Sequence, residues 1–224
     1  MTEGLWLLAL AWSVYFAIHS VLASLWCKRW IEGRWPGVGR RYRLWYNVAA
    51  TALLAVPAGL IWSQQGPLLW HWTGLGKWIA DAAALLGIAG FVATTRYYDM
   101  GAFMGLRVSA DTAADAAQPL RISTLHRFVR HPWYFFGLII LWSRPMDAAW
   151  LVSAVCITVY AAIGSQLEER KLVALYGDAY RQYRRRVPGL IPLPWRWLDR
   201  QGAAALETIA ARQDTGPVSG SGPR

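Results

Sequence analysis

The sequence predicts an all-α, polytopic membrane protein with about five transmembrane helices. Its 224 residues are 55% hydrophobic and only 16% charged. Four long apolar runs carry almost no charge, and they cover residues 4–26, 44–63, 78–95 and 147–167. About 20 apolar residues span a bilayer as a helix. A shorter apolar run, residues 132–143, comes before the last long one, so we expect the final two spans to form a helical hairpin.

The first three spans are predicted from the lengths of the first three apolar runs. The first, Gly4–Trp26, has no basic region before it, so we expect it to stay in the mature protein rather than to act as a secretory signal. It contains His19 and Ser20, which we expect to bond each other or a neighbouring helix. The second span, Leu44–Ser63, and the third, Trp78–Thr95, are separated by a Trp-rich loop that is typical of a membrane interface.

The fourth span is shorter than the bilayer is thick. Residues 132–143 rise roughly 18 Å as a helix, which is less than the ~30 Å hydrocarbon core. Either the helix extends back through Leu125–His131, or it enters the membrane from an indentation on the cytosolic side. Ser143–Asp147 then turns the chain into the fifth span.

The parts outside the spans differ in composition. The longest connection, residues 96–130, mixes aromatic, Gly and Arg residues in its first half, which indicates a functional loop. Its small-residue part, Ser109–Ala117, is interpreted as either a mobile lid or a plain linker. The last residues, Gln201–Arg224, are rich in Ala, Gly and Ser and are predicted to be disordered. We expect residues 1–200 to form a single membrane-embedded domain.

Lysine and arginine alternate in density between successive loops. The four loops carry six, one, five and one of them, and the tail after the fifth span carries ten. This pattern predicts that the N-terminus lies outside and that the C-terminus and the functional site lie in the cytosol. We expect the membrane to be a bacterial inner membrane. The net charge of +10 is then explained by contact with anionic membrane lipids, which argues against nucleic acid as a partner. The four scattered His residues argue against a metal site.

The pair His131-Pro132 predicts a helix start. Pro fits the first helical position, because its missing N–H would be unpaired there anyway. The free amides and the positive dipole end of such a turn favour a carboxylate or a phosphate group. Arg127 and Arg130 add positive charge. The alternative is a basic helix start with nothing bound.

Glu168 and Glu169 extend the fifth helix past its apolar run. Adjacent helical residues point about 100° apart, so we expect at most one of them to face inward. A buried carboxylate needs a cation, and the candidates are Arg127, Arg130 or the ammonium group of a ligand. The alternative partners are the basic residues that follow directly in the sequence, or a loop arginine.

Gly177 and Asp178 predict a break between two helices, because Gly suits a helix C-terminus and Asp an N-cap. The second helix is expected at Ala179–Arg186. Tyr180 and Tyr183 lie three residues apart on one face, and arginines occupy most of the rest. The pattern is typical of an interfacial amphipathic helix on the cytosolic side. Its phenol groups either serve membrane docking alone or also contact a ligand.

These residues together resemble a known family. The pattern is Arg130-His131-Pro132-x-Tyr134-x-x-Gly137, then Glu168-Glu169, Gly177-x-x-Tyr180-x-x-Tyr183 and Val187-Pro188. It is similar to the integral-membrane methyltransferases, which include the isoprenylcysteine carboxyl methyltransferases and the bacterial phospholipid N-methyltransferases. The segments most similar to the methanethiol S-methyltransferase branch, grouped with the NnrU-like proteins, are Phe103–Arg107, Leu125–Pro132 and Gln166–Arg170.

The resemblance implies S-adenosylmethionine (SAM) on the cytosolic side and an acceptor that is a small, methanethiol-like thiol or a lipid-like thiol, carboxyl or amine. It implies cofactor-binding roles for Arg130, His131, Pro132, Tyr134, Gly137, Glu168, Glu169, Tyr180 and Tyr183. The helix start suits the carboxylate of SAM, a glutamate suits its ammonium or ribose hydroxyls, and the tyrosines suit its adenine. A thiol acceptor must be held as the thiolate, which is the catalytic role expected of Arg107 or His126.

Two other classes of function stay open. Membrane sterol and enone reductases use a related C-terminal hairpin to hold NADPH, although they usually have more spans. Some NnrU-like proteins have been supposed to be non-enzymatic transport or assembly factors. The sequence contains no GxGxxG, P-loop, GxSxG or HExxH motif, so none of the common soluble-enzyme sites competes with these interpretations.

Overall fold

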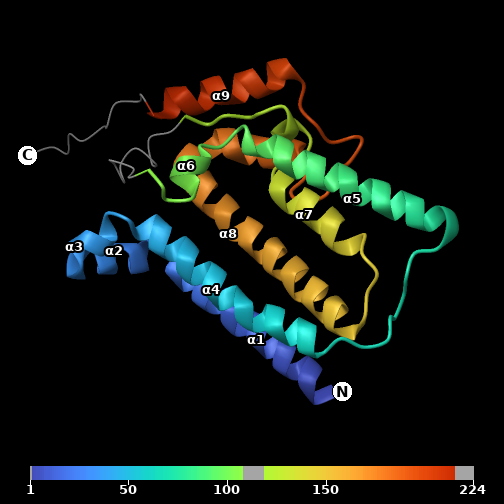
Figure 1. Ribbon diagram of the computed structural model, residues 1–224. Coiled ribbons are helices and arrows are strands. Elements are labelled where there is room, and N and C mark those ends of the chain that lie inside the picture. The colour runs from blue at the N-terminus through green and yellow to red at the C-terminus, as the bar shows by residue number, and fades with distance from the viewer. Residues whose placement is uncertain (1, 108–118, 215–224) are drawn as a thin grey trace, which may run out of the picture. The chain divides into compact units, whose positions relative to one another are not determined.

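The computed structural model describes residues 2–107 and 119–214, and the regular elements there are helices (Figure 1). In chain order they are α1 (Thr2–Leu22), α2 (Leu25–Arg34), α3 (Pro36–Gly39), α4 (Tyr42–Ser63), α5 (Gly74–Thr95), α6 (Met100–Phe103), the 3-10 helix η1 (Leu125–Arg127), α7 (Pro132–Trp142), α8 (Ala148–Arg186) and α9 (Arg200–Asp214). The small-residue segment Ser109–Ala117, expected to be a lid or a linker, lies outside the described residues.

Four of these helices, α1, α4, α5 and α8, are long and apolar enough to cross a membrane. The shorter apolar helix α7 is the fourth predicted span. The all-α, polytopic fold class is therefore confirmed. α7 and the start of α8 form the expected hairpin, because Trp142 Nε1 donates a hydrogen bond of 3.0 Å to Thr158 Oγ1. α7 does not extend back through Leu125–His131, since η1 is a separate turn.

The first apolar run ends earlier as a helix than the sequence predicted. α1 stops at Leu22, and Ser24 caps a new helix by accepting a hydrogen bond of 3.2 Å from the Cys27 N–H. The basic connection between the first two spans, Lys28–Arg43, was expected to be a loop, but most of it lies in α2 and α3. Pro36 stands at the first position of α3, where its missing N–H costs nothing.

The chain divides into two compact units. Unit 1 comprises Met1–Ala110 and Phe136–Ala161, and unit 2 comprises Asp111–Phe135 and Ala162–Arg224. The two helices α7 and α8 each contribute one part to either unit. The prediction of one membrane-embedded domain over residues 1–200 stays a prediction.

Unit 1 is built on α1 and α4, which lie side by side (Figure 1). Its buried cluster contains Leu8, Trp12, Ile61 and Ala149, and Trp12 Nε1 donates to Ser153 Oγ at 2.9 Å. His19 and Ser20 of α1 bond neighbouring helices rather than each other, which is one of the two arrangements expected from the sequence. His19 Nε2 lies 2.9 Å from the Tyr46 hydroxyl, and the Ser20 hydroxyl lies 3.1 Å from that of Tyr160.

A glycine lets α5 approach α7 closely in unit 1. A Cβ added to Gly90 would stand 2.3 Å from the ring of Phe136. Real side chains do not tolerate such a contact, so the aromatic ring occupies the space that glycine leaves open.

Unit 2 has its own apolar core, which joins the end of α8 to α9. The buried members are Leu120, Ile122, Ala179, Tyr180, Tyr183, Val187, Leu198, Ala203, Leu206 and Ala210. Gly177 adopts φ 52° and ψ −127° within α8, so the helix kinks where the sequence predicted a break. The residue takes this conformation readily because it lacks a Cβ. The part of α8 beyond the kink ends at Arg186, as expected.

Helix α9 corrects the prediction of a disordered tail. Residues 200–214 are helical, while residues 215–224 lie outside the described part. Asp199 caps this helix by accepting a hydrogen bond of 2.7 Å from the Gly202 N–H. Ala203, Leu206 and Ala210 repeat at helical spacing and are buried. The Ala-rich composition therefore forms a narrow apolar face that packs on unit 2 rather than a solvated chain.

Candidate functional site

Glu169 lies at the centre of an ion-pair cluster in unit 2. Its side chain is only 4% exposed, and Arg130 places Nη2 2.7 Å from Glu169 Oε1. Arg184 Nε lies 2.9 Å from Oε2, and His131 Nε2 lies 3.1 Å from Oε1. A buried carboxylate is costly unless cations surround it. These contacts therefore explain how a charged Glu169 is accommodated inside the fold.

Glu168 points in a different direction from Glu169, as adjacent residues of a helix must. Its side chain is 52% exposed, and its Oε2 lies 3.5 Å from His131 Nδ1. The oxygens of Glu169 are already engaged by two arginines and by the His131 ring. Glu168 is therefore the carboxylate that a cationic group of a ligand can reach.

The predicted helix start is present, because α7 begins at Pro132. Main-chain hydrogen bonds fix its position within unit 2. The N–H of Arg130 donates to the Pro188 carbonyl at 2.9 Å, and the N–H of His131 donates to the Gly189 carbonyl at 3.0 Å. The segment that follows α8 thus holds the segment that precedes α7.

The His131 side chain is buried and held on three sides. Its ring stacks on Tyr134 with a centroid distance of 5.5 Å. Its Nε2 atom carries a proton, because the Glu169 carboxylate can only accept the hydrogen bond between them. Nδ1 then faces Glu168. The arrangement links both glutamates through one imidazole ring.

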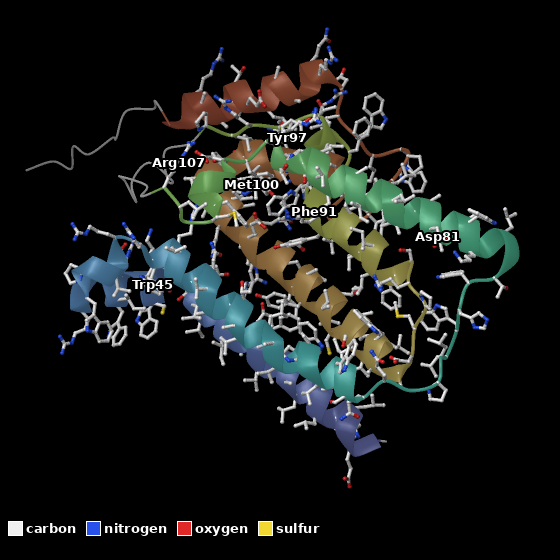
Figure 2. All side chains as sticks on the ribbon, in the orientation of Figure 1. Trp45, Asp81, Phe91, Tyr97, Met100 and Arg107 are labelled. Carbon is white, nitrogen blue, oxygen red and sulfur yellow. The ribbon has the colours of Figure 1, made fainter. Side chains whose placement is uncertain are left out.

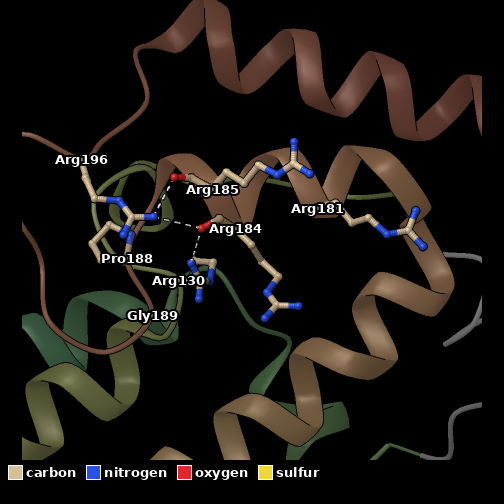
Figure 3. A pocket seen from close by; sticks show the side chains of 7 residues that line it. All are labelled: Arg130, Arg181, Arg184, Arg185, Pro188, Gly189 and Arg196. Carbon is tan, nitrogen blue, oxygen red and sulfur yellow. Dashed lines mark hydrogen bonds between the residues drawn. The ribbon is translucent and has the colours of Figure 1, made fainter.

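A cavity of about 430 Å³ opens beside this cluster (Figure 3). Its lining residues are Arg130, Arg181, Arg184, Arg185, Pro188, Gly189 and Arg196. Gly189 leaves room at this wall, because a Cβ there would lie 3.2 Å from Arg130 Nη2. The cavity is therefore strongly basic and directly adjoins the buried carboxylate of Glu169.

The two predicted tyrosines of α8 are buried in the core of unit 2. Tyr180 and Tyr183 meet edge to face with centroids 5.5 Å apart. The Tyr183 hydroxyl donates a hydrogen bond of 2.6 Å to the His126 carbonyl. At Gly137, no described atom outside the residue's own helix and neighbours lies within 4 Å of the position of an added Cβ. The structure thus gives the two phenols a packing role and leaves open space at Gly137.

His126 lies in η1, and its Nδ1 is 2.7 Å from the Ser123 hydroxyl. Burial, and to a smaller extent the charge of His131, lowers the pKa of His126 to about 4. The ring is therefore neutral at neutral pH. For Nε2 no hydrogen-bond partner is recorded within residues 2–107 and 119–214.

Arg107 lies in unit 1, beside helix α6 (Figure 2). Its Nη1 is 3.3 Å from Asp99 Oδ2, and its side chain is 74% exposed. Asp99 also caps α6 by accepting a bond of 3.0 Å from the Ala102 N–H. That bond, together with the Arg107 charge, lowers the pKa of Asp99. Arg107 thus forms an exposed ion pair with Asp99 within the loop after α5.

Sequence reasoning did not single out Arg184 or Arg196. Several arginines follow one another near the end of α8, and only the rotation of the kinked helix selects Arg184 as a partner of Glu169. Arg127, one of the expected partners of an inward glutamate, instead donates from Nε to the Leu198 carbonyl at 2.8 Å. The described residues contain no group of three His, Cys, Asp or Glu side chains that could hold a metal ion.

Comparison with curated proteins finds relatives that share one description. Methanethiol S-methyltransferase 2 of Bradyrhizobium diazoefficiens is 34% identical over 185 residues, which cover 79% of this chain and 69% of the relative. Methanethiol S-methyltransferase of Pseudomonas deceptionensis is 32% identical over 79% of this chain and 69% of its own length. The Mycobacterium tuberculosis protein of that name is 32% identical over 82% of this chain and 76% of its own length. No family model and no solved structure matches the chain.

Proposed function

Because this chain belongs to the methanethiol S-methyltransferase family, we propose that it is a SAM-dependent membrane enzyme that methylates a small thiol. The name shared by the relatives supports methanethiol as the first acceptor to test. We further propose that the site faces the cytosol, in keeping with the distribution of Lys and Arg among the loops.

The contrast between the two adjacent glutamates is the observation that carries the cofactor proposal. Glu169 is enclosed by Arg130, Arg184 and His131, whereas Glu168 is half exposed beside the same imidazole. An exposed carboxylate next to a fixed helix start offers complementary partners to an amino acid group. The ammonium of SAM fits Glu168, and its carboxylate fits the positive end of α7 at Pro132.

In this proposal Glu169 positions other groups and does not itself bind the cofactor. It fixes the Arg130 and His131 side chains, and the main-chain bonds of these two residues fix the start of α7. Tyr134 stacks on His131 and lines the same region. The open space at Gly137, one turn further along α7, leaves room for a bulky group against the helix backbone.

Methyl transfer to sulfur requires little from the protein besides correct placement of the acceptor and its deprotonation to a thiolate. Bound SAM supplies an electrophilic methyl group on a sulfonium sulfur. An acceptor thiolate would take this methyl group in line with its breaking bond to the sulfonium sulfur and would leave S-adenosylhomocysteine, so alignment of the acceptor would supply much of the rate. His126 suits the acceptor side, because its neutral ring can accept a hydrogen bond from Ser123 at Nδ1 and donate one from Nε2 to the acceptor sulfur. Arg107 is the second candidate for this role.

Ligand binding tests the proposal and separates it from its alternatives. Purified protein in detergent is titrated calorimetrically with SAM, S-adenosylhomocysteine and NADPH. We expect the two adenosyl ligands to bind and NADPH not to bind. Protein that binds SAM is then given methanethiol, and dimethyl sulfide is measured in the gas phase. Binding of NADPH alone would indicate a reductase, and a folded protein that binds none of the three would indicate a transport or assembly factor.

A further inference from the structure

The basic cavity of unit 2 holds more positive charge than nearby carboxylates neutralise. Five of its lining residues are arginines, at positions 130, 181, 184, 185 and 196. Two of the five pair with Glu169 and one pairs with Asp178. Among the residues that the structure describes, no carboxylate pairs with Arg185 or Arg196. Positive charges around one cavity repel each other, so an anion bound there is stabilised.

The two unpaired arginines are held in different ways (Figure 3). Arg196 Nη2 donates to the carbonyl groups of Arg184 and Arg185, at 3.2 and 2.7 Å, which fixes its guanidinium at the end of α8. The guanidinium of Arg185 makes no recorded hydrogen bond in the described part of the chain. A planar guanidinium donates two parallel hydrogen bonds to a phosphate group. Figure 3 shows the Arg185 side chain extending away from Arg196. Because this side chain is exposed, its guanidinium can turn toward an anion that Arg196 holds.

The loop that carries Arg196 also exposes large apolar side chains. Ile191 is 66%, Trp195 76% and Trp197 49% exposed. Exposed indole rings are typical of the headgroup level of a bilayer. The α8 arginines that line the cavity come after the apolar part of that helix in the sequence, where the helix becomes charged. An anionic group with an apolar tail matches this combination better than a free ion does.

We propose that the cavity binds the phosphate group of an anionic phospholipid, with Arg185 and Arg196 as its principal donors and Trp195 beside the acyl region. This is a lipid site distinct from the cofactor and acceptor sites. Arg130 and Arg184 line the same cavity and pair with Glu169, so a bound phosphate group reduces the repulsion between the arginines there. The lipid composition of the membrane then influences the stability of the cluster.

Soluble short-chain lipids test this proposal. The full chain in detergent is titrated calorimetrically with dihexanoylphosphatidylglycerol, with dihexanoylphosphatidylcholine and with inorganic phosphate. We expect the anionic lipid to bind more tightly than the other two. Arg185→Gln should weaken its binding by about tenfold or more, since hydrogen bonds between charged groups are involved. Arg196→Gln should do the same.

Arg186→Gln is the matched control. Arg186 has the same charge and is adjacent in the sequence, but it does not line the cavity. Equal losses in Arg185→Gln and Arg186→Gln would show diffuse attraction and overturn the proposal. Equally tight binding of inorganic phosphate would overturn a lipid source. SAM affinity should be unchanged in Arg185→Gln, and a parallel loss would instead assign the cavity to the cofactor. Because no hydrogen bond of the Arg185 guanidinium is recorded in the described residues, this variant decides the test even if Arg196→Gln misfolds.

Discussion

Arg130 and Glu169 form a buried ion pair in which Nε and Nη2 of the guanidinium each lie 2.7 Å from the same carboxylate oxygen. The two residues are 39 positions apart and belong to the segments before α7 and within α8. The same guanidinium also donates to carbonyls at the end of α8, including that of Arg184 at 3.0 Å. One side chain therefore connects three segments of unit 2.

Removing the charge of Glu169 should destabilise the protein. Glu169→Gln leaves Arg130 and Arg184 buried or half-buried without their counter-charge. Breaking one partner of a buried pair typically costs about 3–5 kcal/mol. Thermal unfolding in detergent, followed by circular dichroism, should show a clear decrease in Tm. The control is Glu168→Gln, whose exposed side chain should change stability by less than about 1 kcal/mol. Equal decreases in the two variants would contradict the division of roles between the glutamates.

The same control variant should lose cofactor affinity. Glu168→Gln keeps the shape of the side chain but removes the charge that the proposal pairs with the ammonium of SAM. A charged hydrogen bond contributes about 1.5–3 kcal/mol, so we expect the Kd for SAM to rise by at least about tenfold. Calorimetric titration measures this. His131→Ala should also weaken SAM binding and abolish turnover. Full turnover of both variants would show that the cofactor is held elsewhere.

His126 should make stability depend on pH in a defined window. Its pKa is lowered to about 4 in the folded chain, whereas an unfolded His titrates near pH 6.5, as an approximate reference value. Between these values the unfolded chain binds more protons, so stability decreases as pH falls from about 6.5 toward 4. His126→Asn should flatten this slope. Tm measured across that range tests it, with His71→Asn at an exposed histidine as the control. An unchanged slope in His126→Asn would rule out this residue as the cause.

Helix α9 should contribute to stability although its sequence looks unstructured. Leu206 is 1% exposed in the core of unit 2. Leu206→Ala should cost about 2–5 kcal/mol, because it removes buried methyl groups and leaves a cavity. Thr208→Ala, on the exposed side of the same helix, should cost less than about 1 kcal/mol. Limited proteolysis of both variants would show whether α9 detaches. Similar protection of the two would mean that α9 does not pack as described.

The sequence predicted the spans and the helix start at Pro132 well, since both depend on local composition. Gly177 is a second success, because only glycine adopts its backbone angles without strain. Local composition failed at α9, where small residues form a face that becomes apolar enough only when α8 covers it. The choice of Arg184 rather than a neighbouring arginine as the partner of Glu169 depends on helix rotation after a kink. No spacing rule determines that rotation from the sequence.

The side-chain hydrogen bond between Arg130 and the Val187 carbonyl also imposes an order on biosynthesis. Arg130 and its acceptor Val187 are 57 residues apart. A ribosome that adds about 5–20 residues per second needs about 3–12 s to make that distance. During this interval the apolar helices can already enter the bilayer, although the Val187 carbonyl that accepts from Arg130 has not yet been synthesised. Membrane insertion can therefore begin before the proposed ligand site is complete, and a chain arrested before Val187 would lack the Val187 acceptor of Arg130.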